Sequence, residues 1–187
     1  MFFERYDKKH MESFAINVIA KSFDLKYATY VRPTDTDNFD YVSPDDLHAV
    51  EIVSVIPANE LEAYKYEKQL AQGKKMPQSD RVINAIVRED GSLGGYYGGS
   101  LTAIIQSVKN AIIEKCTKAR KRTNLQKYET IDLCICIVDG GLLDLYSFQN
   151  ARFDFSESLF DNIFFITASC FIRYSKSSLY EEYSRKI

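Results

Sequence analysis

The chain has 187 residues, of which 45% are hydrophobic and 27% are charged, and its formal net charge is −2. This composition is close to the globular average, which excludes a disordered chain or a fibrous repeat, and the length predicts one domain over residues 1–187. No run approaches the roughly 18 apolar residues that a membrane-spanning helix needs, so we expect no membrane partner. Because the net charge is close to zero, binding of nucleic acid would have to depend on a local basic patch.

The first part of the chain is predicted to hold one helix and three short strands. Apolar residues spaced by three and four positions predict a helix over residues 5–23. Alternating apolar and polar residues, rich in β-forming side chains, predict strands over 25–31, 39–42 and 48–56. Pro57 ends the third of these, because proline cannot continue a central ladder.

The middle of the chain is predicted to be largely helical. Good helix formers predict a helix over 58–72 that ends at Gly73, and an apolar stripe predicts a longer helix over 100–120. Between them we expect a further helical turn or two over 80–88, followed by a glycine-rich loop over 90–99.

The last predicted elements are strands over 131–138 and 142–146, a strand or strand pair over 162–172, and a short helix over 176–187. The strand at 131–138 is apolar on both faces, as expected for a central strand covered on two sides. The order of elements therefore predicts an α/β domain of three layers, in which a mixed central sheet has helices on both sides.

Four cysteines and two histidines limit the chemistry that the chain can carry. Cys134 and Cys136 lie in an apolar run, where we expect small buried side chains, and no further Cys or His pair completes a zinc site. His10 and His48 stand apart, so we expect no histidine-based triad. Unpaired thiols fit a reducing compartment, and charges occupy the N-terminus where a signal peptide needs its apolar core, so we expect a cytoplasmic protein.

Three acidic residues are candidates for a common site. Glu51 lies in the middle of an apolar strand, where a carboxylate is costly unless it is paired, hydrogen-bonded or bound to a metal. Asp40 lies on the preceding strand of the same hairpin, and Glu12 lies near the buried face of the first helix. Three carboxylates converging at one sheet edge would form an oxygen-rich site for Mg²⁺ or Mn²⁺.

Each acid also has a purely structural interpretation. Asp40 fits a turn or the edge of a strand, and Glu51 fits an ion-pair partner or a charge that protects an edge strand. Glu12 fits a plain surface residue of the first helix. These interpretations stay open on the sequence alone.

The order helix, three strands, helix, strand, with Asp40 on the second strand and Glu51 on the third, resembles the PD-(D/E)XK nuclease superfamily. That family has a restriction-endonuclease-like core with the order α-β-β-β-α-β, and the resemblance covers about residues 10–138, with strands and a helix added over 142–187. It implies a metal-dependent phosphodiesterase or endonuclease that acts on DNA. Asp40 and Glu51 would be catalytic and would hold Mg²⁺ or Mn²⁺, and Glu12 would assist as a third metal ligand.

The sequence departs from the family motif at Val53, where the family has a lysine that orients and activates the attacking water. Some members recruit a lysine from a neighbouring element, and Lys65 and Lys68 on the next predicted helix are the candidates for this catalytic role. Otherwise the chain would be an inactive relative that binds DNA without cleaving it. The alternative function is a non-enzymatic protein-interaction module, including a homo-oligomer, that keeps the fold with a vestigial site.

A run of basic residues follows the centre of the long predicted helix. Residues 115–127 hold six lysines and arginines and no acid. Such a patch would neutralise phosphates and make DNA binding dependent on salt. The candidates for phosphate contact are Lys115, Lys118, Arg120, Lys121 and Arg122. The same run also fits the solvated C-terminal end of a helix, where cations complement the helix dipole.

Overall fold

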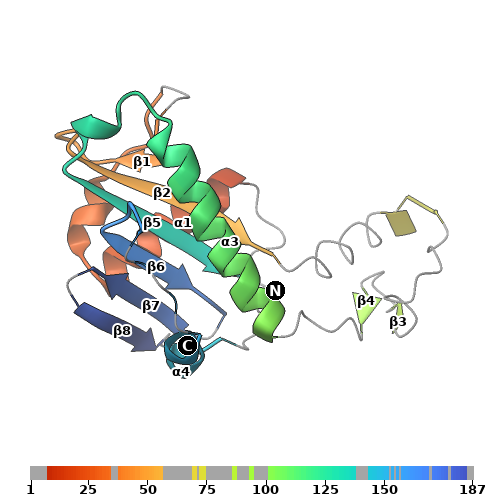
Figure 1. The fold of residues 1–187 in the computed structure, drawn as a ribbon. Helices are drawn as coiled ribbons and strands as arrows, with labels where there is room; N and C mark the ends of the chain where they lie inside the picture. Colours follow the sequence, from red (N-terminus) through yellow and green to blue (C-terminus); the bar gives the residue numbers. More distant parts are fainter. Residues whose placement is uncertain are drawn as a thin grey trace.

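Six strands form one mixed sheet in the order β1-β2-β5-β6-β7-β8 in the computed structural model of the chain (Figure 1). The strands are β1 (Tyr41–Val42), β2 (His48–Val55), β5 (Thr130–Ile137), β6 (Asn162–Ile166), β7 (Cys170–Ser175) and β8 (Ser178–Ser184). The structure describes residues 8–34, 38–56, 69–70, 72–74, 86–87, 93–94, 101–137, 143–151, 153, 155, 157–168, 170–176 and 178–184.

The centre of the sheet is parallel and its edges are antiparallel. β2 pairs with β5 and β5 pairs with β6 in parallel, whereas the other three neighbouring pairs are antiparallel. A parallel pair needs a crossover, and α3 (Leu101–Arg120) lies between β2 and β5 in the chain, while α4 (Leu145–Asn150) lies between β5 and β6. The predicted mixed α/β sheet is therefore confirmed.

Helices cover both faces of the sheet, as the apolar central strand predicted (Figure 1). On one face, α1 (Lys8–Ser22) buries Ala15 and Ile19 against a cluster that includes Val50 and Ile52 of β2. On the other face, α3 packs with a second cluster that includes Ala49 and Val55 of the same strand; its buried residues are Ile104, Val108, Ile112, Cys116 and Ala119. Successive residues of β2 thus serve opposite layers.

The strand predicted over 25–31 is wrong. Leu25–Thr29 forms a 3₁₀ helix, η1, which begins where the Asp24 carboxylate accepts a hydrogen bond of 2.9 Å from the backbone N–H of Lys26. An aspartate that bonds the backbone two residues ahead bends the chain into a turn, which the β-forming side chains that follow do not overcome. Only Val31 retains a strand-like contact, as an isolated bridge to Val42.

Two predicted elements near the C-terminus are also wrong. In place of a strand over 142–146, α4 begins at Leu145, because the Asp144 carboxylate accepts a hydrogen bond of 2.8 Å from the Ser147 N–H and caps the helix. In place of a helix over 176–187, the chain forms β8, which pairs with β7. Pairing with an existing sheet edge outweighs a local preference for helix.

Parts of the central segment differ from the prediction or lie beyond it. Ile86–Val87 forms the short strand β3, paired with β4 (Leu93–Gly94), where a helical turn and a loop were expected. The predicted helix over 58–72 lies mostly outside the described residues, but its end at Gly73 is confirmed, because that residue has a φ of 72° and donates to the Leu70 carbonyl at 2.8 Å.

Within the described part of the chain, neither α1 nor α3 nor α4 has the length and apolar character needed to cross a membrane.

Candidate functional site

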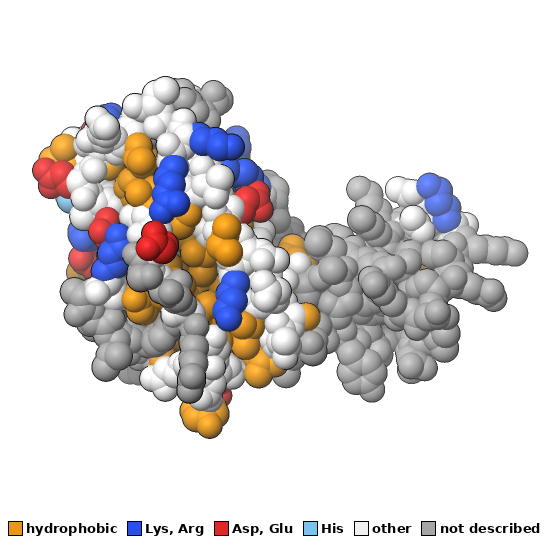
Figure 2. Space-filling view, in the orientation of Figure 1, with side chains coloured by type: hydrophobic (Ala, Val, Ile, Leu, Met, Phe, Trp, Pro, Cys, Tyr) orange, Lys and Arg blue, Asp and Glu red, His pale blue; other side chains and the backbone are white. Residues whose placement is uncertain are grey.

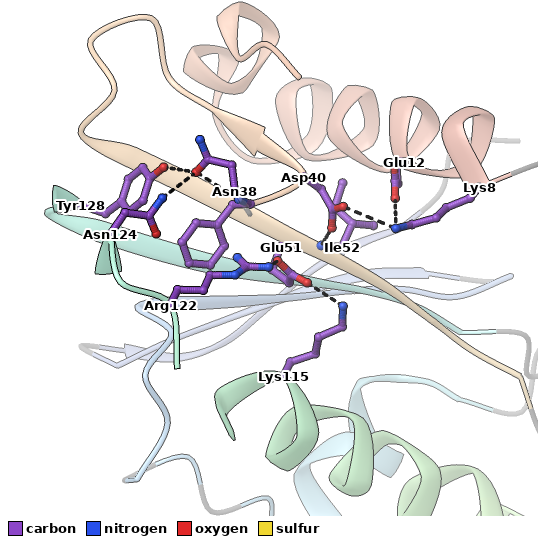
Figure 3. A network of polar contacts seen from close by, with 11 residues as sticks. Lys8, Glu12, Asn38, Asp40, Glu51, Ile52, Lys115, Arg122, Asn124 and Tyr128 are labelled. Carbon is purple, nitrogen blue, oxygen red and sulfur yellow. Dashed lines mark hydrogen bonds and ion pairs between the residues drawn. The ribbon is translucent and has the colours of Figure 1, made fainter. Parts of the chain in front are cut away.

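Glu51 is the centre of a buried ion-pair network on the α3 side of the sheet. Its side chain lies in the middle of β2 and the residue is 6% exposed. Lys115 Nζ lies 2.6 Å from Glu51 Oε1, and Arg122 Nη2 lies 3.0 Å from Oε2 (Figure 3). Both cations are themselves largely buried. The carboxylate predicted to need a partner therefore has two, one on each oxygen.

Lys115 reaches Glu51 because of its place on the buried side of α3. It lies three residues after Ile112 and one before Cys116, and both of these pack against the sheet. The long side chain extends from the helix across the layer to the strand (Figure 3). A lysine ammonium thus stands beside Glu51 although Val53 occupies the motif position, and it comes from α3, whereas Lys65 and Lys68 lie outside the described residues.

Asp40 lies next to this network at the start of β1. The register of β1 with β2 pairs Tyr41 with Val50, and Asp40 is the residue immediately before Tyr41. Asp40 Oδ2 accepts a hydrogen bond of 2.8 Å from the backbone N–H of Ile52, which fixes the carboxylate to β2. Burial raises the pKa of the Asp40 carboxyl, and the bond from Ile52 partly opposes that shift.

Glu12 is fully buried on α1, so its interpretation as a plain surface residue is wrong. Lys8 Nζ lies 3.3 Å from Glu12 Oε1, and Arg32 Nη2 lies 2.5 Å from Oε2. Lys8 also lies 3.8 Å from Asp40 Oδ1, and the pKa of its ammonium is raised by Asp40 and then by Glu12 (Figure 3). Lys8 therefore links the acid of α1 to the acid of β1.

The loop before Asp40 is held by the connection between α3 and β5. The Asn38 Oδ1 accepts hydrogen bonds from the Tyr128 hydroxyl and, at 3.4 Å, from Asn124 Nδ2 (Figure 3). The Phe39 ring packs edge-on against Tyr128 with centroids 5.1 Å apart, and Arg122 Cζ lies 4.1 Å from the centre of the same ring. Arg122 therefore orients Glu51 and Phe39 at once.

The basic run does not act as one patch. Lys115 and Arg122 turn inward to Glu51, whereas Lys118 pairs with Glu114 at 2.5 Å and Arg120 Nη2 donates to the Glu157 carbonyl at 2.7 Å. Lys121 is exposed. Figure 2 shows acidic and apolar side chains interspersed with the basic ones on the face that carries α3. Contact with phosphates by Lys118, Arg120 and Lys121 stays a prediction.

Binding of a divalent cation by the three predicted acids stays a prediction. Among the residues that the structure describes, no three acids, histidines or cysteines stand close enough together to hold a metal. Both oxygens of Glu12 face cations, and so do both oxygens of Glu51. Mg²⁺ usually keeps several waters and takes one or two carboxylates from a protein, and Asp40 and Glu51 are the predicted pair. A role for Glu12 as a ligand stays a prediction.

Three participants of this network escaped the sequence analysis. Lys8 stands four residues before Glu12, a spacing that indicates an ion pair on one helix face. Arg32 and Phe39 follow from no local pattern, because their partners come from elements distant in sequence.

No family model, no curated protein and no solved structure matches the chain.

Proposed function

We propose that the chain is a metal-dependent phosphodiesterase of the nuclease-like kind that acts on DNA at Asp40 and Glu51. The observation that carries the proposal is the distance of 2.6 Å between Lys115 Nζ and Glu51 Oε1. Lys115 supplies an ammonium group that the motif lacks because of Val53, and it does so from the neighbouring helix α3. We assign the role of the motif lysine to Lys115, and the roles predicted for Lys65 and Lys68, which lie outside the described residues, stay predictions.

The order of elements supports the same proposal. α1, the bridge at Val31, β1, β2, α3 and β5 occur in this chain order as helix, three extended segments, helix and strand, with η1 inserted after α1 and the short strands β3 and β4 inserted between β2 and α3. Apart from these insertions, the order resembles the α-β-β-β-α-β order of the PD-(D/E)XK core. The two acids occupy the second and third extended segments, which antiparallel pairing places side by side.

A divalent cation held by Asp40 and Glu51 would supply water activation and charge stabilisation for phosphodiester hydrolysis. The chain's own groups do the rest. Lys115 brings a positive charge and proton-donating N–H groups to the Glu51 carboxylate, where they can orient a water or a phosphate oxygen. Arg122 and the Ile52 N–H hold the two carboxylates in fixed positions. A site that is already positioned loses less entropy when it binds substrate.

The test is cleavage of plasmid and single-stranded DNA in Mg²⁺ or Mn²⁺ by the wild type and by Lys115→Met. We expect the variant to lose about 100-fold in rate, the usual size of a general acid–base or electrostatic contribution. Lys109→Met is the matched control, because Lys109 lies on the same helix with its ammonium over Phe153, away from Glu51.

Equal rates for Lys115→Met and wild type would contradict the site assignment. A wild type that neither cleaves DNA nor binds Mg²⁺ would contradict the enzymatic proposal altogether, and it would favour the protein-interaction module. Circular dichroism and thermal unfolding of both variants separate loss of the site from loss of the fold.

A further inference from the structure

A hollow of about 280 Å³ lies between the C-terminal half of β2 and the middle of α3. Its lining consists of residues 53–56 from the strand and, from the helix, Ser107, Asn110, Ala111, Glu114 and Lys115. Lys115 belongs both to this lining and to the ion pair with Glu51, so the hollow adjoins the proposed phosphodiesterase site.

The lining combines apolar and hydrogen-bonding side chains. Val53, Val55 and Ala111 offer apolar surface, while Ser107 and Asn110 offer hydroxyl and amide groups. Small-molecule sites characteristically have this mixture of apolar walls and a few polar groups that fix orientation. Val53, which replaces the lysine of the nuclease motif, therefore also lines the hollow. It offers an apolar surface at a position where the family's lysine would carry a charge.

Charge favours one part of the hollow for a phosphate. The Lys115 ammonium adjoins Glu51, and Glu114, the preceding residue of α3, is exposed and pairs with Lys118 at 2.5 Å. A phosphate is attracted to Lys115 and repelled by Glu114. A nucleotide would therefore place its phosphate toward Lys115 and its sugar and base along Val53 and Asn110.

The volume restricts what can enter. Sites for drug-sized ligands span roughly 300–1,000 Å³, and this hollow of about 280 Å³ lies just below that range. One base with its sugar is closer to this size than a base pair of an intact duplex, which has two bases held in plane. An unpaired base also enters a pocket without the cost of leaving a stack and a pairing partner.

We propose that this hollow binds the sugar and base of one unpaired nucleotide, so that the substrate is single-stranded DNA or an unpaired strand end. This inference rests on the proposed function, because the phosphate of that nucleotide lies at the site of Lys115 and Glu51. The specificity for unpaired DNA comes from the fit of one nucleoside between β2 and α3.

The first experiment measures binding without catalysis. Deoxyadenosine and deoxyadenosine 5′-monophosphate are titrated into the full chain and followed by NMR shifts of backbone amides. We expect shifts at Val53 and Asn110 with both probes. Ser107→Phe fills the hollow and should weaken binding at least about tenfold, whereas Ile113→Phe adds the same ring at a residue of α3 that is 64% exposed and should leave binding unchanged.

Equal binding by the two phenylalanine variants, or shifts confined to residues outside the hollow, would overturn the inference. Asn110→Ala guards against a folding defect in Ser107→Phe, because Asn110 is exposed and removing its amide should still weaken binding. Retained affinity in Asn110→Ala together with a misfolded Ser107→Phe would count against the hollow as the site.

The second experiment separates this inference from the proposed function. Cleavage of a single-stranded oligonucleotide is compared with cleavage of the matching blunt duplex, and we expect the single strand to be preferred and Ser107→Phe to lose that preference. A wild type that binds deoxyadenosine in the hollow yet cleaves neither DNA would overturn the phosphodiesterase and leave the nucleotide site standing. A wild type that cleaves both DNAs equally, with no shifts in the hollow, would overturn the nucleotide site alone.

Discussion

Two carboxylates lie buried on neighbouring strands of the same sheet, and they differ in every partner. Glu51 of β2 faces α3 and is paired with the cations Lys115 and Arg122. Asp132 of β5 is 2% exposed and belongs to the other face, because the parallel register places Leu133, not Asp132, beside Glu51. The two acids thus face opposite sides of one sheet, Glu51 with two cations and Asp132 with uncharged hydrogen-bond donors.

The partners of Asp132 are uncharged. Its Oδ2 accepts a hydrogen bond of 2.6 Å from the Tyr27 hydroxyl, and its Oδ1 accepts bonds from the backbone N–H and the side-chain amide of Asn162 at 3.0 and 2.8 Å. These bonds tie η1 and β6 to the central strand. A carboxylate that accepts hydrogen bonds from three neutral donors fits a structural role, whereas Glu51 is the acid of the proposed site.

The largest expected difference between the two acids is in catalysis. Glu51→Gln should lower DNA cleavage by about 100-fold or more, because the amide has no charge to hold a cation or to pair with Lys115. Asp132→Asn should leave the rate unchanged, since it lies on the far face of the sheet. Rates of plasmid cleavage for the two folded variants test this, and equal losses in both would erase the distinction.

The next largest effect is on stability, and here the larger loss is expected for variants of Asp132. Asp132→Ala leaves the buried Tyr27 hydroxyl and two donors of the half-buried Asn162 without an acceptor, so we expect the free energy of unfolding to fall by about 3–5 kcal/mol. Urea denaturation measures this fall. Asp132→Asn keeps one acceptor, so it should lower the free energy of unfolding by less. If the alanine variant is as stable as the wild type, Asp132 does not have the structural role assigned to it.

A smaller effect is expected in the pH dependence of stability. Burial raises the pKa of the Asp132 carboxyl, so the folded state holds its proton more tightly than the unfolded chain does. The stability contributed by this group is present below about pH 4, the ordinary range of aspartic acid, and is lost as the pH rises through the raised pKa. The difference in unfolding free energy between wild type and Asp132→Asn should therefore decrease over that interval and then level off.

Urea titrations of both proteins across this pH range provide the measurement. Asp40, whose pKa is also raised by burial, is present in both proteins and cancels in the difference. A difference that grows with rising pH would show that the hydrogen bonds to the ionised form outweigh burial.

The smallest effect is expected for an ion pair on the surface. Lys118 and Glu114 pair across one turn of α3 and both are mostly exposed. Such pairs contribute about 0.3–0.5 kcal/mol, so Lys118→Ala should shift the urea midpoint only slightly. A loss as large as that of Asp132→Ala would mean that this pair is not the simple solvated contact that its exposure indicates.

The contrast between local and distant contacts explains what the sequence could predict. Periodicity and apolar patterning predict three features: the apolar stripe of α3, the apolar run of β5, and the burial of Glu51 within an apolar strand. All three are confirmed in the fold. Asp24 and Asp144 redirected two predicted strands through side-chain bonds to nearby backbone, a competition that β-propensity does not contain. β8 exists because β7 offers an open edge.

The candidate site was predictable only in part, for the same reason. Asp40 and Glu51 belong to one hairpin, so their proximity follows from a short turn. Lys115 is 64 positions from Glu51, and its approach depends on how α3 crosses the sheet, which no local pattern specifies. The basic run indicated that cations gather there, but it did not indicate which of them turn inward.

The four free cysteines offer a separate way to follow the two faces of this sheet. All four are buried, Cys134 and Cys136 in the layer under α1, and Cys116 and Cys170 in the layer under α3. A thiol reagent reaches each sulfur only when its own layer opens. Time-resolved labelling of single-cysteine variants would therefore report whether α1 and α3 leave the sheet together or one before the other.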